Sequence, residues 1–151
     1  IGDAGATRSN VGLTQINASN FGDLEVAWTW RGDNMGPTPT YSARGIPIYV
    51  DGMLYTVSGS RRQVVAIDPA TGETIWTFRE PNTTRYMRSP RAAHGKGVAY
   101  GELDGRGVIF ITSPAFFLWA LDAKTGLPVE GWGRPVSPNT TASPRPISVT
   151  V

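Results

Sequence analysis

One stretch of the chain occurs twice, and this repeat limits the possible fold more than any other feature. The first copy, residues 64–76, reads VVAIDPATGETIW, and the second, residues 117–132, reads FLWALDAKTGLPVEGW. Asp68 recurs as Asp122, a displacement of 54 positions that the neighbouring alanine, threonine and glycine share. A unit repeated at this period indicates stacked supersecondary units, because each unit has an apolar face that it cannot bury alone.

The composition favours many short strands joined by tight turns. Among 151 residues there are 18 Gly and 12 Pro, and they separate short apolar runs instead of forming one low-complexity block. No run approaches the ~18 apolar residues of a membrane span. The formal charge of +2 is too small, and the 14 Lys and Arg too dispersed, to indicate nucleic-acid binding. Cysteine is absent, which excludes disulfides and thiolate metal sites.

Apolar residues at a period of two predict the strands. Residues 24–30 (LEVAWTW) alternate as a half-buried strand does, and we interpret them as a closing strand like residues 73–78. Residues 46–57 predict a hairpin, because Asp51-Gly52 suits the positive φ angles of a type I′ turn. The other predicted strands are 63–67, 74–78, 97–100, 108–112, 117–121 and 129–132, with a turn at 102–107.

These strands divide the chain into four parts. Residues 1–45 form a lead-in that carries one closing strand, and residues 46–80 form a first set of four strands. Residues 81–133 form a second set, entered through an irregular basic loop at 81–96. Residues 134–151 form a linker whose last residues, PISVTV, are a candidate first strand of a third unit.

The distinctive residues of the repeat have structural explanations. Asp68, at a strand end, can accept hydrogen bonds from backbone N–H groups of the turn, and Gly72 can adopt an angle that other residues resist. Trp76 offers a broad apolar surface and one N–H donor for filling the space between adjacent sheets. We therefore interpret the repeat as scaffold, and we call the segment from the aspartate to the glycine the clasp.

The pattern Ala-x-Asp-x-x-Thr-Gly-x-x-x-Trp at residues 66–76 resembles the tryptophan-docking repeat of β-propeller quinoproteins, the pyrroloquinoline quinone (PQQ) dehydrogenases for alcohols and sugars. The second copy departs from it by two extra residues before Trp132. The similarity extends over most of residues 2–133. It implies an all-β fold made of antiparallel four-stranded blades, of which this chain would supply about two in a ring of eight. Since two blades cannot close a ring, the resemblance also implies that the rest of the propeller, or other chains, complete it.

The resemblance implies PQQ and a calcium ion as cofactors, a small alcohol or sugar as substrate, and a periplasmic or extracellular location. Lys96 falls where the family often has a cofactor-binding arginine, and Arg91 falls in the region of a cysteine pair that this chain lacks, as glucose dehydrogenases do. Arg44 falls where alcohol dehydrogenases carry a cofactor-contacting glutamate. We name these three as candidate cofactor-binding residues and expect the catalytic base and the calcium ligands in later blades.

Alternatives remain for the loop and for the whole chain. PQQ carries three carboxylates, so its site needs cations, which the basic loop supplies as Arg85, Arg88, Arg91, His94 and Lys96. The same loop could instead be a solvated basic segment or an ion-pair partner between blades. Glu102 and Asp104 lie in one hairpin turn, which offers too few oxygens for calcium. The alternative function is a non-catalytic propeller that serves as a scaffold or a protein-binding module.

Overall fold

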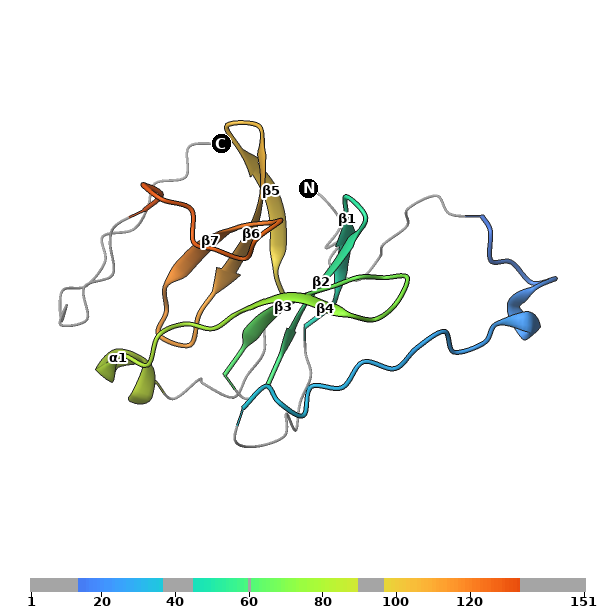
Figure 1. Cartoon of the computed structure of the whole chain (residues 1–151), viewed down its shortest axis with the longest axis horizontal. Coiled ribbons are helices and arrows are strands. Elements are labelled where there is room, and N and C mark those ends of the chain that lie inside the picture. The colour runs from blue at the N-terminus through green and yellow to red at the C-terminus, as the bar shows by residue number, and fades with distance from the viewer. Residues whose placement is uncertain (1–13, 37–44, 60, 90–96, 134–151) are drawn as a thin grey trace.

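The computed structural model describes residues 14–36, 45–59, 61–89 and 97–133. Their strands form two antiparallel sheets, in the orders β1-β2-β3-β4 and β5-β6-β7 (Figure 1), which confirms the predicted all-β class. The strands of the first sheet are β1 (Ile48–Val50), β2 (Met53–Ser58), β3 (Gln63–Ile67) and β4 (Thr74–Phe78); those of the second are β5 (Ala99–Leu103), β6 (Arg106–Thr112) and β7 (Leu118–Asp122). Two short helices, η1 (Phe21–Asp23) and α1 (Thr84–Met87), lie outside the sheets. No helix in these ranges is long and apolar enough to cross a membrane.

The first sheet agrees closely with the prediction. Asp51 and Gly52 have φ angles of 49° and 78°, as a type I′ turn requires, and they join the paired residues Val50 and Met53. Strands β3 and β4 have the predicted bounds. Residues with strong β propensity, bounded by turn residues that accept positive φ, were therefore sufficient to locate this sheet.

The second sheet corrects two predictions. The predicted turn at 102–107 was too long, because Glu102 pairs with Gly107 and the ladder continues to the Asp104-Gly105 turn. The predicted strand at 129–132 was wrong: up to Gly133, the last described residue, the structure has one isolated bridge after β7, between Leu121 and Pro128. Gly131 has a φ angle of 72°, as does Gly133, and positive φ interrupts the extended backbone that a strand needs.

The predicted closing strand at 24–30 stays a prediction, because these residues pair with none of the described strands and a closing strand pairs with a blade outside them. Two tryptophans hold this segment instead. The Nε1–H of Trp28 donates to the carbonyl oxygen of Pro69 at 2.9 Å, and that of Trp30 donates to Oγ1 of Thr74 at 2.9 Å. A strand requires a neighbouring backbone. On the predicted apolar face of this segment, Trp28 and Trp30 are half-buried, while Leu24 and Val26 are exposed.

The same tryptophan junction occurs twice. The Nε1–H of Trp76 donates to the carbonyl oxygen of Ala123 at 3.0 Å, and Ala123 is the repeat equivalent of Pro69. The ring of Trp76 lies against Gly126, where an added Cβ would come within 2.4 Å of it, and the ring of Trp28 lies in the same way against Gly72, at 2.7 Å. Each tryptophan therefore fills a space that only glycine leaves open.

The aspartate of each clasp performs the predicted role. Oδ1 of Asp68 accepts from the N–H groups of Ala70 and Thr71, and Oδ1 of Asp122 accepts from the equivalent groups two and three residues further on. Although burial acts to raise the pKa of Asp122, these hydrogen bonds and the nearby Arg106 lower it below its usual value.

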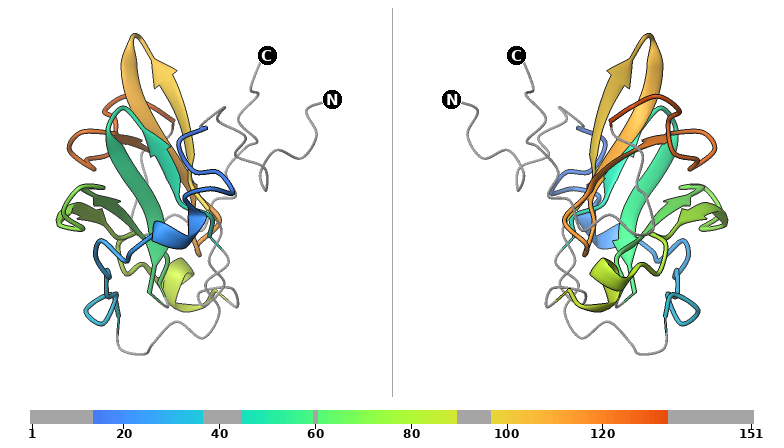
Figure 2. Two further views of the ribbon diagram at one scale, coloured as in Figure 1. Left: turned by 90° about the vertical axis from the view of Figure 1, so that its right-hand side faces the viewer. Right: turned by 90° about the vertical axis from the view of Figure 1, so that its left-hand side faces the viewer.

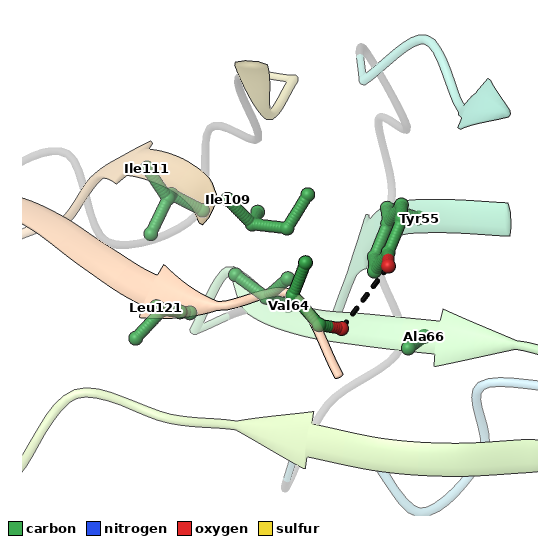
Figure 3. Packing of buried hydrophobic residues seen from close by; sticks show 7 residues of the cluster. Tyr55, Val64, Ala66, Ile109, Ile111 and Leu121 are labelled. Atoms are coloured by element: carbon green, nitrogen blue, oxygen red, sulfur yellow. Dashed lines mark hydrogen bonds between the residues drawn. The ribbon is translucent and has the colours of Figure 1, made fainter. Parts of the chain in front are cut away.

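The hydrophobic core lies between the two sheets (Figure 3). Its buried members are Tyr55, Val64 and Ala66 of the first sheet and Ile109, Ile111, Leu121 and Ala123 of the second sheet and its clasp. The hydroxyl of Tyr55 donates to the carbonyl oxygen of Ala123 at 3.0 Å, so this oxygen accepts from both Tyr55 and Trp76. The two sheets thus pack face to face and share a polar anchor at their junction.

Candidate functional site

The antiparallel topology divides the connections between two ends of the sheets. The hairpin turns of β1-β2 and β5-β6 and the two clasps lie at one end. The turns of β2-β3 and β6-β7 and the segment that follows β4 lie at the other, which we call the loop end. Figure 2 shows the two hairpin tips at the top of the molecule and α1 near the bottom. The loop end is the candidate functional site, because it gathers most of the described basic residues: Arg61, Arg62, Arg79, Arg85 and Arg88.

A buried carboxylate lies at the centre of the loop end. Glu80 is 4% exposed, and all the groups that donate to it belong to the β6-β7 turn or to β7. Its Oε1 accepts from Oγ of Ser113 at 2.7 Å and from Nε1 of Trp119 at 3.4 Å, and its Oε2 accepts from the N–H of Ala115 at 3.2 Å. These donors compensate the cost of removing a carboxylate from water.

Arginines from two connections of the first sheet also lie at the loop end. The guanidinium of Arg61 lies 5.3 Å from the ring centroid of Tyr86 and donates to Oδ1 of Asn82, and Arg62 donates to the carbonyl oxygen of Thr112 at 3.4 Å. Arg85 lies over the ring of Phe117, 4.7 Å from its centroid. The loop end can therefore attract an anion, since its arginines project from two neighbouring connections.

The helix α1 positions Arg85 and was not predicted. Thr83 caps it, because its Oγ1 accepts from the N–H of Tyr86 at 3.1 Å. Tyr86 is 3% exposed, and its hydroxyl has no hydrogen-bond partner among the described residues. Burial raises the pKa of the Tyr86 hydroxyl, with smaller contributions from the charges around it.

The three predicted cofactor-binding residues lie outside the described residues. Lys96, Arg91 and Arg44 therefore stay predictions, as does His94. Of the predicted basic loop, the structure describes Arg85 and Arg88, with the former held against Phe117 and the latter exposed.

Glu80 is the buried charged residue of the candidate site that the sequence pattern did not single out. A signal for it exists in β4, where Trp76 and Phe78 are more buried than their neighbours and Glu80 continues the same period of two. A charged residue at an inward position of an amphipathic pattern indicates a buried polar contact.

The loop end fits one of the two implied cofactors. Its arginines match an anion such as a tricarboxylate in charge, and the Tyr86 hydroxyl adds a buried donor that none of the described groups uses. In contrast, the described residues contain no group of three or more His, Cys, Asp or Glu that could hold a metal ion. The part of the chain that the structure describes thus has cations that match the charge of a quinone's carboxylates, and it has no ligand set for a metal ion.

Comparisons with known proteins support this interpretation of the fold. A PQQ family model described as the β-propeller domain of glucose/ethanol/alcohol dehydrogenase matches residues 2–139. Quinohemoprotein alcohol dehydrogenase ADH IIB of Pseudomonas putida is 34% identical over 147 residues, which cover 91% of this chain and 18% of that protein. Quinohemoprotein alcohol dehydrogenase of Comamonas testosteroni is 37% identical over 123 residues, which cover 76% of this chain and 15% of that protein.

Solved structures show the same similarity. The crystal structure of quinohemoprotein alcohol dehydrogenase from Comamonas testosteroni matches with a TM-score of 0.57 and 32% identity, over 78% of this chain and 16% of that one. A europium-containing methanol dehydrogenase matches with a TM-score of 0.53 and 25% identity, over 77% of this chain and 19% of that one. The chain spans less than a fifth of the length of these relatives.

Proposed function

Because the chain belongs to the family of PQQ dehydrogenase β-propeller domains, we propose that it forms part of the wall of a quinoprotein that oxidises an alcohol or sugar hydroxyl group. The observation that carries this proposal is the repeated junction. Trp28 binds the first clasp as Trp76 binds the second, with hydrogen bonds of 2.9 and 3.0 Å to equivalent carbonyl oxygens. A junction that repeats in this way propagates blades around an axis, and a ring of eight blades is the arrangement we propose.

In this proposal the chain contributes cations and an ordered loop end to the quinone site. Lys96 and Arg91 would bind carboxylates of PQQ, and Arg44 would contribute from the neighbouring unit. When bound, PQQ supplies the acceptor for the two electrons that leave the substrate. The catalytic base and the metal ligands would come from blades outside this chain, and the whole enzyme would act in the periplasm or outside the cell.

Reconstitution of the full-length protein with PQQ and calcium tests the proposal. We expect quinone absorbance to survive dialysis and an alcohol or sugar to reduce a dye. We expect Lys96→Ala and Arg91→Ala each to raise the Kd for PQQ by about 10-fold or more, since a charge-assisted hydrogen bond contributes about 1.5–3 kcal/mol.

The matched control is Lys124→Ala, which removes one exposed lysine from the clasp at the opposite end of the sheets and should leave the Kd unchanged. Loss of all quinone absorbance from the wild-type protein on dialysis would instead favour the scaffold alternative. If Lys96→Ala and Lys124→Ala change the Kd for PQQ equally, Lys96 does not bind the quinone. The proposed enzyme class would be unaffected by that result.

A further inference from the structure

The hydrogen bonds of Glu80 continue beyond its own donors. The Oγ of Ser113, which donates to Glu80, also accepts from the N–H of Phe117 at 3.2 Å. The backbone N–H of Ser113 donates to the carbonyl oxygen of Phe117 at 2.8 Å and closes the turn. A continuous set of contacts therefore links Glu80, just after the first sheet, to Phe117, directly before β7.

The β6-β7 turn has a conformation that needs this support. Phe116 has a φ angle of 63°, a conformation that is unfavourable in free energy for any residue with a side chain. The ring of Phe116 is mostly exposed, so its packing does little to offset this cost. Ala115 and Phe117, the residues on either side of it, both donate their N–H groups into the Glu80–Ser113 network. The network thus holds a strained turn in a single shape.

The β6-β7 turn also contacts an arginine of the basic loop. Arg85 lies 4.7 Å from the centroid of the Phe117 ring, an arrangement in which the ring attracts the guanidinium and limits its rotation. A second contact joins the same two segments, since Oγ of Ser89 donates to the carbonyl oxygen of Pro114. The described half of the basic connection therefore rests on the turn that Glu80 organises.

We propose that Glu80 is a positioning residue for quinone binding. Its carboxylate fixes the β6-β7 turn, the turn presents the ring of Phe117, and the ring holds Arg85 and the start of the basic loop in place before the quinone arrives. Because the start of the loop is already ordered, binding of the quinone removes less conformational entropy, and the affinity for the quinone is higher. This inference rests on the proposed function, because it needs the loop end to bind PQQ.

Two variants of the full-length protein test it, with one matched control. Glu80→Gln keeps the shape of the side chain but turns one acceptor oxygen into a donor facing existing donors. Phe117→Leu keeps an apolar residue and removes the aromatic ring, and it remains informative where Glu80→Gln fails to fold. The control, Glu102→Gln, makes the same change of charge at an exposed position on β5.

Three measurements are compared: the Kd for PQQ by tryptophan fluorescence quenching, the thermal midpoint of the protein without quinone, and hydrogen exchange of residues 113–117. We expect Glu80→Gln and Phe117→Leu to raise the Kd about three- to ten-fold over the control, the range for immobilising one flexible side chain on binding. We expect faster exchange at 113–117 in Glu80→Gln, while exchange in the clasp at 122–126 stays unchanged.

A lowered thermal midpoint with a Kd equal to that of Glu102→Gln would overturn the inference, because a purely structural role changes stability and leaves the affinity of the folded protein alone. Failure of the wild-type protein to bind PQQ would overturn the proposed function itself, and this inference with it. The wild-type titration therefore separates the two failures.

Discussion

At the scale of single residues, the paired tryptophan and glycine of each junction have the largest structural effect. Gly126 is buried and has a φ angle of 72°, and Trp76 occupies the space next to its Cα. A side chain at this position would meet both backbone strain and the indole ring. Two separate effects, the backbone angle and the contact with the indole ring, therefore favour glycine at this position.

A comparison of two glycines separates these reasons. Gly105 has nearly the same φ angle, 73°, but nothing lies within 4 Å of an added Cβ. We expect Gly105→Ala to lower the free energy of unfolding by about 1–2 kcal/mol, from strain alone. Gly126→Ala should lower it by about 1–3 kcal/mol more, because the indole must also move. Urea unfolding of the full-length protein measures the difference, and equal losses would show that the indole moves without cost.

At the scale of elements, one carbonyl oxygen at the junction of the two sheets accepts two hydrogen bonds. Tyr55 comes from β2, Trp76 from β4, and the oxygen belongs to Ala123, directly after β7. The rings of Tyr55 and Trp76 are also in contact, with centroids 5.9 Å apart. Two strands of one sheet thus converge on a single backbone group of the other.

A double-mutant cycle tests this arrangement. Tyr55→Phe and Trp76→Phe each remove one donor and leave the oxygen with the other, so each should cost about 1 kcal/mol in hydrogen bonding. The double variant leaves a buried carbonyl oxygen without a described donor, so its loss of unfolding free energy should exceed the sum of the single losses by about 1 kcal/mol. Strictly additive losses would mean that water replaces the missing donors.

At the scale of the whole molecule, apolar surface remains exposed among the described residues. Val26 is 83% exposed, and Phe21 and Leu24, in the same lead-in, are more than half exposed. Within the described ranges, the outer edge of β7 has a single bridge, to Pro128. Surfaces of this kind in a propeller are covered by neighbouring blades, which agrees with a ring completed by further blades.

We therefore expect the 151-residue chain, expressed alone, to self-associate. Sedimentation velocity should show an average mass that rises with concentration. A variant with Phe21, Leu24 and Val26 replaced by serine should associate less, because it exposes less apolar area. A monodisperse monomer that unfolds cooperatively would contradict the requirement for a completed ring.

The sequence alone determined the features that depend on local chemistry. The Asp51-Gly52 turn, the bounds of β3 and β4 and the roles of Asp68 and Gly72 follow from residue types at fixed spacings, and the repeat identified the family. Such features are predictable because turn angles and side-chain alternation depend on neighbouring residues.

Only the tertiary structure decided which segments meet. The alternation at 24–30 placed Trp28 and Trp30, which are half-buried, on one face, but it could not reveal that no described strand pairs with them. The alternation in β4 predicts that Glu80 points inward. No neighbouring residue, however, indicates that its partners are Ser113, Ala115 and Trp119, more than 30 residues away. The packing of one sheet on the other determines which residues so distant in sequence come into contact. The contacts at the loop end therefore follow from the tertiary structure and not from the local sequence.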